Sequence, residues 1–235
     1  MGNTEIIDMF IIYISGIDGC GKTTQSKLLV DVLAKKGFDV EYLWLRWEPS
    51  IQKAIGLIRS LIRRKRATKE DMNVTQIEDM EQSNWLSFKR RLLLNPFIRQ
   101  LWWAYACIDY YTVSHKQIRN LNGKIIVVDR YVDDFVIDQA WNFGLLPENS
   151  SRLTANLFLK RFRTADLKII IDLPAIEGYV RKGDGTPLQY LRNREPYYES
   201  IPTSENTIHL NGLKDADSLS KEITDWVSLK LEEVP

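Results

Sequence analysis

Five short apolar runs recur along the chain, and each has the length of a β-strand. They cover residues 9–15, 38–47, 123–131, 165–174 and 206–212. The first run, MFIIYIS, is almost continuously apolar and leads into a glycine, which is typical of a strand buried on both faces of a parallel sheet. The third and fourth runs each carry an aspartate close to their ends. The pattern therefore predicts a buried parallel sheet with polar groups where the strands end.

The stretches between these runs are long enough for helices. Helices are predicted at residues 22–36, 51–65, 85–121, 149–163, 187–200 and 215–231. Gly37 ends the first of them, because glycine takes the left-handed conformation that closes many helices. Pro96 starts a second helix within its segment, since proline fits the first helical position. Asp215 or Asp217 caps the last helix.

The order of these elements predicts the fold class. Strand, helix and strand follow one another within the first 47 residues, which indicates a βαβ unit. We expect an α/β fold with a doubly wound parallel sheet of about five strands flanked by helices. Residues 1–235 are expected to form a single domain, and the polar stretch 66–84 is interpreted as a surface insert.

Composition narrows the class of protein. The 235 residues contain 44% hydrophobic and 27% charged residues, which excludes a disordered, collagen-like or disulfide-stapled chain. A net charge of +1 gives no overall field toward nucleic acid or membranes. The two cysteines fit a reducing cytosol, so we expect a cytoplasmic protein. No apolar run reaches the roughly 18 residues that a membrane span needs, and the N-terminus lacks the basic region of a signal peptide.

One motif points directly to chemistry. The segment GIDGCGKT follows the first predicted strand, opens the first predicted helix and matches the phosphate-binding P-loop pattern G-x-x-x-x-G-K-[ST]. Backbone N–H groups and the helix N-terminus would cradle phosphates there, while a lysine and a hydroxyl reach the β/γ-phosphates and Mg²⁺. The alternative is a glycine-rich turn that binds nothing. The predicted ATP phosphate-binding residues are Gly16, Gly19, Cys20, Gly21, Lys22, Thr23 and Thr24.

Several further motifs resemble those of thymidylate kinases, which are P-loop nucleoside monophosphate kinases. The first ten residues from Gly16, GIDGCGKTTQ, are close to that family's P-loop. The other matching segments are Asp129-Arg130-Tyr131, the Arg46-Trp47-Glu48-Pro49 segment with Trp47 inserted, IIIDLP at 169–174, Arg181-Lys182-Gly183 and YLRNREPYYESI at 190–201. The resemblance spans roughly residues 10 to 230 and is poor within 50–100.

This resemblance implies transfer of the γ-phosphoryl group of ATP to a monophosphate, dTMP in that family, with Mg²⁺ as cofactor. The catalytic residues would then be Asp18, Lys22 and Arg130. Thr23 and Asp129 would bind the Mg²⁺ ion. Lys22 would serve the donor, and Arg130 would clamp the acceptor phosphate, because two anions brought together in line need cations on both sides. The alternative for Asp129 and Arg130 is an ion pair at a strand end.

The resemblance also implies a basic lid at residues 178–195. Some thymidylate kinases carry an arginine inside the P-loop, where this chain has Gly19. A cation from the lid is then needed to neutralise charge on the transferred group. The candidates are Arg181, Lys182, Arg192 and Arg194, of which Arg181 or Arg192 is preferred. The alternative is that these are ordinary charges of an exposed helix.

The acceptor pocket departs from the family pattern. A gapless count places the base-stacking aromatic at Tyr105 and an aspartate, Asp109, where an arginine should donate to thymine. An ionised carboxylate has no donor, so it disfavours thymine and favours an amino or ring N–H group. The alternative is an error in the count, with Arg99 supplying the donor. The predicted acceptor residues are Asp18, Arg46, Pro49, Tyr105, Asp109, Arg130, Tyr131 and Asp138. The acceptor therefore stays open between dTMP, another nucleotide and a phosphorylated non-nucleotide.

Two further segments leave alternatives open. The basic cluster at 59–66 fits a membrane-surface or anion-binding helix, or a solvated helix end. Aromatic and basic residues alternate at 85–111, which fits single-stranded nucleic acid or a long core helix, and we expect the helix. The expected partners are ATP, a small phosphorylated acceptor and a second copy of the chain, with no nucleic acid. A nucleotide-binding regulator with little turnover is the rival function.

Overall fold

The computed structural model describes residues 9–51, 91–121, 123–150, 153 and 158–233. Two predictions therefore lie outside the described residues, the insert at 66–84 and the basic cluster at 59–66. The helix predicted at 51–65 also lies outside them, except for its first residue.

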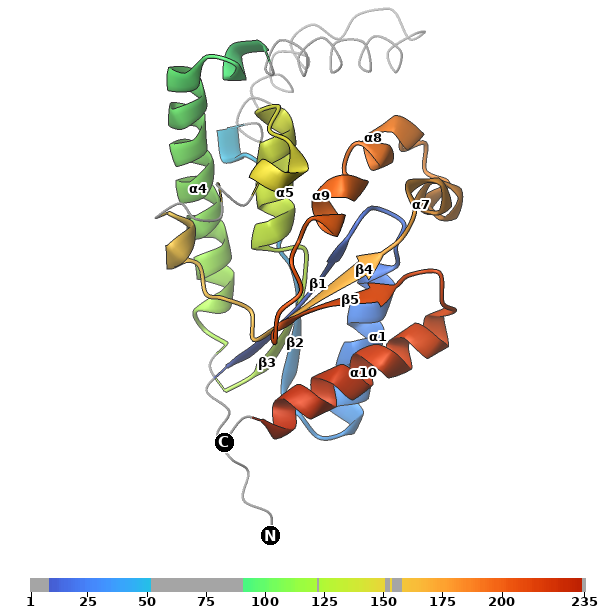
Figure 1. Cartoon of the computed structure of the whole chain (residues 1–235). Helices are drawn as coiled ribbons and strands as arrows, with labels where there is room; N and C mark the ends of the chain where they lie inside the picture. The colour runs from blue at the N-terminus through green and yellow to red at the C-terminus, as the bar shows by residue number, and fades with distance from the viewer. Residues whose placement is uncertain (1–8, 52–90, 122, 151–152, 154–157, 234–235) are drawn as a thin grey trace, which may run out of the picture.

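All five predicted strands are present in one sheet (Figure 1). They are β1 (Phe10–Gly16), β2 (Val40–Trp44), β3 (Ile125–Asp129), β4 (Leu167–Asp172) and β5 (Thr207–Asn211). The order across the sheet is β2-β3-β1-β4-β5, and every neighbouring pair is parallel. The carboxyl ends of all five strands consequently meet at one edge, where ligands of open α/β sheets bind.

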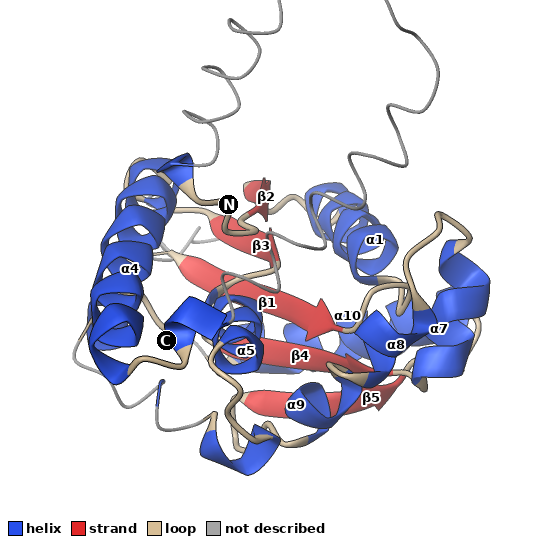
Figure 2. Ribbon diagram, turned by 90° about the horizontal axis from the view of Figure 1, so that it is seen from above, coloured by secondary structure: helices blue, strands red, loops and turns tan. Residues whose placement is uncertain are grey.

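Helices cover both faces of this sheet (Figures 1 and 2). One face carries α1 (Lys22–Lys35) and α10 (Ala216–Glu232), and the other carries α4 (Pro96–Ile118) and α5 (Val132–Asn142). In β1, Ile12 belongs to the core cluster that includes α1, whereas Ile11 belongs to the one that includes α4. Because alternate side chains enter two different apolar layers, the strand sequence is apolar at every position.

Three predicted helix boundaries are confirmed, and each depends on a capping residue or on a proline or glycine at the helix end. Asp215 caps α10, because its Oδ1 accepts from the backbone N–H of Ser218 at 3.0 Å. Pro96 is the first residue of α4, after the cap Asn95. Gly37 follows the end of α1 with a φ of 92°.

Two predictions about helices were wrong, and two helices were missed. Residues 187–200 form two short helices, α8 (Leu188–Arg192) and α9 (Glu195–Glu199), because Pro196 starts a new helix at its first turn. A helix was predicted at 149–163, but the C-terminal part of this segment contains the 3₁₀ turn η2 (Leu159–Arg161) instead. Another 3₁₀ turn, η1 (Pro147–Asn149), lies at the start of the segment. Neither α5 nor α7 (Ala175–Lys182) was predicted. In α5 the acids Asp133 and Asp134 are buried, which hides the helical pattern.

This architecture is the α/β fold of the P-loop NTPases: a five-stranded parallel sheet between helices, with the glycine-rich loop joining β1 to α1. Among the described residues, no helix combines the length and apolar character needed to cross a membrane.

Candidate active site

The glycine-rich loop adopts a backbone that favours glycine at residues 16, 19 and 21, and at the first two a side chain would also collide with neighbouring backbone. Gly16 and Gly19 have φ values of 142° and 88°. A Cβ at Gly16 would lie 2.5 Å from the carbonyl oxygen of Ile171 in β4, and a Cβ at Gly19 would lie 2.3 Å from that of Gly178 in α7. The contact with Gly178 leaves no room for a side chain at residue 19. An arginine at residue 19 is thus sterically excluded, so any second cation beside Lys22 has to come from another segment.

Lys22 is the first residue of α1, and its side chain lies inside the loop. It is only 5% exposed. Its Nζ donates to the carbonyl oxygens of Gly16 at 2.8 Å and Ile17 at 2.7 Å, and lies 3.8 Å from Asp18 Oδ1. A buried ammonium group is costly unless it is bonded in this way. The loop therefore holds a positive charge at its centre.

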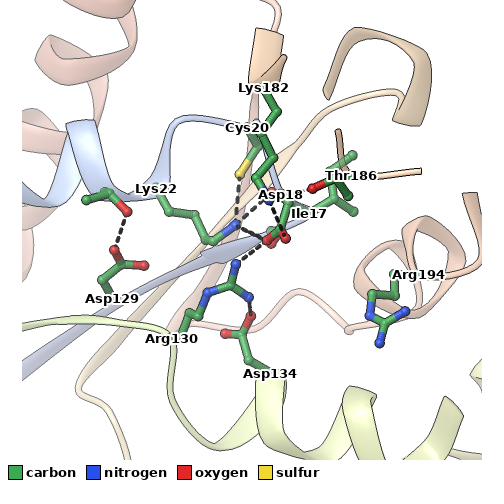
Figure 3. A network of polar contacts seen from close by, with 12 residues as sticks. Ile17, Asp18, Cys20, Lys22, Asp129, Arg130, Asp134, Lys182, Thr186 and Arg194 are labelled. Carbon is green, nitrogen blue, oxygen red and sulfur yellow. Dashed lines mark hydrogen bonds and ion pairs between the residues drawn. The ribbon is translucent and has the colours of Figure 1, made fainter. Parts of the chain in front are cut away.

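Asp18 is the point at which three cations converge (Figure 3). Its carboxylate pairs with Arg130, with Lys182 Nζ at 3.2 Å and with Lys22 Nζ at 3.8 Å. Burial alone would raise the pKa of Asp18, but the positive charges of Arg130 and Lys22 outweigh it and hold that pKa well below its usual range. The carboxylate is consequently ionised throughout the physiological range.

Arg130 reaches the loop because the chain turns sharply after β3. The residue has a φ of 68°, in the left-handed region that side chains rarely adopt. Its guanidinium pairs with Asp18 on one side and lies 3.5 Å from Asp134 Oδ1 on the other. Burial lowers the pKa of Arg130, but Asp134 and Asp18 together raise it above its ordinary value. The guanidinium is therefore charged and held between two carboxylates.

Asp134 is a functional candidate to which sequence reasoning assigned no role. It lies in α5, is 5% exposed and joins three elements. Its carboxylate accepts from Tyr13 of β1, from Ser15 Oγ at 2.9 Å and from Tyr198 of α9 at 2.7 Å. The only signal in the sequence was an acid within the apolar segment VDDFVI. These bonds fix the carboxylate against which Arg130 rests.

Thr23 and Asp129 lie together, and Figure 3 shows Asp129 on the side of Lys22 away from Asp134. The Thr23 hydroxyl donates to Asp129 Oδ2 at 2.5 Å, and the Tyr42 hydroxyl donates to the same oxygen at 3.1 Å. Burial, followed by the charge of Asp129, raises the pKa of Tyr42 to about 12. Asp129 is fully buried, and its Oδ1 has no hydrogen-bond partner among the described residues. A carboxylate oxygen without a partner next to a hydroxyl is a donor set that suits a hard cation such as Mg²⁺.

A cavity of about 640 Å³ opens over the loop and includes part of the predicted lid. Lys182 extends from α7, where its Nζ contacts Asp18 and Thr186 Oγ1 at 2.8 Å. Arg181 donates to the carbonyl oxygen of Gly212 at 2.8 Å. The lining residues are Asp18, Gly19, Cys20, Gly21, Lys22, Thr23, Thr24, Gln25, Arg130, Arg181, Lys182, Gly212, Lys214, Asp215, Ala216 and Leu219.

The other two lid candidates lie away from this cavity. Arg192 is exposed at the end of α8. Arg194 pairs with Asp138 Oδ1 at 3.0 Å, and its guanidinium lies 3.7 Å from the centre of the Tyr190 ring. The structure thus brings Arg181 and Lys182 to the loop, whereas Arg194 and Asp138 form a separate pair.

Two predicted acceptor residues, Tyr105 and Asp109, lie in α4 and form hydrogen bonds with the segment that follows β2. Asp109 Oδ2 accepts from Trp47 Nε1 at 3.0 Å and from the backbone N–H of Ser50 at 3.1 Å. The Tyr105 hydroxyl accepts from the backbone N–H of Ile51 at 3.1 Å. Both side chains therefore cap the start of a helical turn at residues 50–51, which the family pattern did not indicate.

Three acceptor candidates lie close enough to Tyr190 for their charges to act on it: burial raises the pKa of Tyr190, the charges of Asp138 and Asp18 add to the rise, and that of Arg46 opposes it. Pro49 is buried and Arg46 is exposed. Tyr131 is 4% exposed, its ring packs edge-on against Tyr13 of β1 at 6.1 Å, and it does not line the P-loop cavity.

The sequence is similar to curated proteins named thymidylate kinase. It is 26% identical to one from Thermoanaerobacter sp. (strain X514) over 226 residues, which cover 92% of this chain and 96% of that protein. It is 27% identical to one from Fervidobacterium nodosum over 225 residues, with 92% and 96% covered. It is 29% identical to a probable thymidylate kinase of Pyrococcus horikoshii over 173 residues, with 73% and 69% covered. No protein-family model matches the chain. Over most of its length, the chain thus resembles thymidylate kinases at low identity.

Proposed function

We propose that this chain is an ATP-dependent nucleoside monophosphate kinase that resembles thymidylate kinase. It would transfer the γ-phosphoryl group of ATP to the phosphate of a (deoxy)nucleoside monophosphate, and dTMP is the acceptor suggested by the related proteins. The observation that carries the proposal is the meeting of Lys22, Arg130 and Lys182 at Asp18, above a P-loop and within one cavity.

The arrangement supports phosphoryl transfer for an electrostatic reason. Donor and acceptor both carry negative phosphates, and catalysis of this reaction depends on positioning and on charge stabilisation. Lys22 lies where the β- and γ-phosphates of a P-loop ligand bind. Arg130 faces it from the end of β3 and would bind the acceptor phosphate in a bidentate manner. Lys182 supplies the cation that residue 19 cannot supply.

Asp18 keeps these cations ordered before the phosphates bind. Its ionised carboxylate pairs with Arg130 and Lys182, so each cation already points into the cavity. Incoming phosphate oxygens would compete for the same donors, and little reorganisation would be needed at the moment of transfer.

Thr23 and Asp129 are the residues that would hold Mg²⁺, because both offer oxygen and Oδ1 of Asp129 has no hydrogen-bond partner in the described part of the chain. When bound, the ion would neutralise charge on the β- and γ-phosphates.

The identity of the acceptor rests on a narrower observation. Asp109 stands where thymine recognition calls for a donor, and its carboxylate is engaged by Trp47 and Ser50. A kinase of this fold with a different acceptor, another nucleotide or a phosphorylated small molecule, is therefore the second candidate. The homodimer and the cytoplasmic location stay predictions.

A coupled assay of ADP release, run with ATP and a panel of monophosphates, tests the function. The panel contains dTMP, dCMP, dGMP, dAMP and a sugar phosphate. We expect turnover with at least one nucleoside monophosphate, and the preferred base separates the two candidates. Binding of ATP without ADP release for any acceptor would contradict the proposal and favour a nucleotide-binding regulator. Lys22→Ala should abolish turnover, and Lys27→Ala, an exposed lysine of the same helix, is the matched control.

A further inference from the structure

A second cavity, of about 440 Å³, lies on the α4 face of the sheet and is lined by the C-terminal part of α4. It reaches from Met9, just before β1, to Tyr131, which directly follows Arg130 after the carboxyl end of β3. The lining residues are Met9, Tyr111, Ser114, His115, Ile118, Arg119, Tyr131, Arg161, Phe162 and Arg163. None of them lines the P-loop cavity. Its volume is in the range of small-molecule sites.

The charge of this cavity has one sign. Three of the lining residues are arginines, one is a histidine and none is an acid. Arg163 donates to the carbonyl oxygen of Met9 at 2.9 Å, which fixes its guanidinium at the cavity. No carboxylate in the described part of the chain pairs with Arg119 or Arg161. Guanidinium groups that share a concave surface without acids form a site for an oxyanion.

A tyrosine hydroxyl of the same cavity has no hydrogen-bond partner among the described residues. Tyr131 lines the cavity and is 4% exposed, with the rings of Tyr13, Tyr110 and Phe162 packed around its own. Although the ring is buried, the hydroxyl is not among the fully buried polar atoms, and no described residue forms a hydrogen bond with it. This is a polar group that a ligand in the cavity would satisfy.

Flat side chains form the remaining wall. The Tyr111 ring is stacked on His115, with 5.2 Å between ring centres and 20° between the planes. Phe162 meets Tyr111 edge-on at 5.5 Å. Such a wall favours a planar ring over a flexible aliphatic chain.

We propose that this cavity is a second ligand site, which binds a small compound carrying an oxyanion, phosphate or carboxylate, on a planar ring. Arg119, Arg161 and Arg163 bind the oxyanion, the Tyr131 hydroxyl donates a hydrogen bond to it, and the ring lies against Tyr111 and Phe162. The site is separate from the P-loop cavity and takes its ligand independently of ATP.

Isothermal titration calorimetry with phenyl phosphate tests the proposal. We expect saturable binding to the full chain, weaker binding of inorganic phosphate, and benzoate bound at the same site. A double change, Arg119→Glu with Arg161→Glu, should weaken phenyl phosphate at least tenfold, because charge-assisted hydrogen bonds are replaced by repulsion. Lys160→Glu, at an exposed lysine that does not line the cavity, should change the affinity less than twofold.

The Lys22→Ala variant distinguishes binding in this cavity from binding at the P-loop. We expect its affinity for phenyl phosphate to be unchanged. Loss of binding in this variant would place the probe at the P-loop and overturn the proposal. So would the absence of saturable binding at millimolar probe, or equal affinity in the double variant. If the double variant melts at a lower temperature than the wild type, Tyr131→Phe decides the matter. It removes only the hydroxyl, should weaken phenyl phosphate severalfold, and contradicts the proposal if the affinity is unchanged.

Discussion

The indole Nε1 of Trp47 donates to Asp109 Oδ2 at 3.0 Å, and this bond joins the segment after β2 to the middle of α4. In the resemblance to thymidylate kinases, Trp47 is inserted into the R-E-P segment, and a gapless count puts Asp109 where an arginine is expected. The two departures from the family pattern thus explain each other, since one supplies the donor and the other the acceptor. The same oxygen also caps the N–H of Ser50.

Replacement of this carboxylate tests its structural role. Asp109→Ala leaves Trp47 Nε1 and the Ser50 N–H without their acceptor, and we expect the free energy of unfolding to fall by about 1–2 kcal/mol. Asp109→Asn keeps one acceptor oxygen and should lose less. Urea denaturation measures both. Equal stability of the alanine variant and the wild type would show that these bonds contribute nothing, and would leave Asp109 available for an acceptor.

Arg130→Ala tests the proposed clamp on the acceptor phosphate. We expect kcat/KM for the acceptor to fall at least 100-fold, which corresponds to the loss of about 3 kcal/mol from a bidentate charged contact. The KM for ATP should change by less than about threefold, because Lys22 and the loop backbone serve the donor. Steady-state kinetics with each substrate varied in turn separate the two effects. A rise in the KM for ATP alone would assign Arg130 to the donor.

Asp134 is expected to act as a positioning residue through Arg130. Asp134→Asn removes the charge that faces Nη1 of Arg130 at 3.5 Å, so the acceptor kcat/KM should fall about tenfold while the KM for ATP is retained. Tyr198→Phe is the matched control, because it removes a donor to the same carboxylate but keeps the charge. A lower melting temperature with unchanged acceptor kinetics would mean that Asp134 only stabilises the fold.

The charge of Asp18 predicts a dependence of stability on pH. The pKa of Asp18 is lower in the folded chain than in the unfolded chain, so its ionised form contributes stability above the ordinary aspartate pKa of about 4. That contribution is lost as the pH falls toward the folded pKa. We expect the wild type to be more stable than Asp18→Asn at pH 7, with a difference that shrinks steadily below about pH 4.

Urea titrations across this range measure the difference for Asp18→Asn. Asp31→Asn is the control, since Asp31 is an exposed carboxylate of α1. A difference that is constant from neutral to acid pH would contradict the assignment.

Because Asp129 and Thr23 offer oxygen ligands to a cation, we expect turnover to require a divalent ion. Chelation of Mg²⁺ should abolish turnover, and added Mg²⁺ should restore it. Asp129→Asn should raise the Mg²⁺ concentration for half-maximal turnover at least tenfold, because the charged oxygen beside Thr23 is lost. Tyr42→Phe removes only a hydrogen bond to Asp129 and should have a smaller effect. Calorimetry of ATP binding with and without Mg²⁺ gives a readout that does not depend on turnover.

Local patterns were sufficient for the strands, the P-loop and the ends of several helices. Each depends on residues close together in the chain: continuous apolar runs for buried strands, G-x-x-x-x-G-K-T for a loop that must turn tightly, and Asp215 for the first turn of α10. These signals arise from backbone sterics and from burial of one short segment, so no knowledge of distant residues is needed.

Pairing across the fold was decided by the tertiary structure alone. The sequence by itself could not show that Gly178 excludes a side chain at residue 19, that Lys182 rather than Arg192 reaches Asp18, or that Asp134 supports Arg130. Asp18 and Lys182 are 164 positions apart. Which charges meet depends on how helices close over the sheet, and hydrogen bonds and ion pairs act over a few ångströms in space irrespective of separation along the chain.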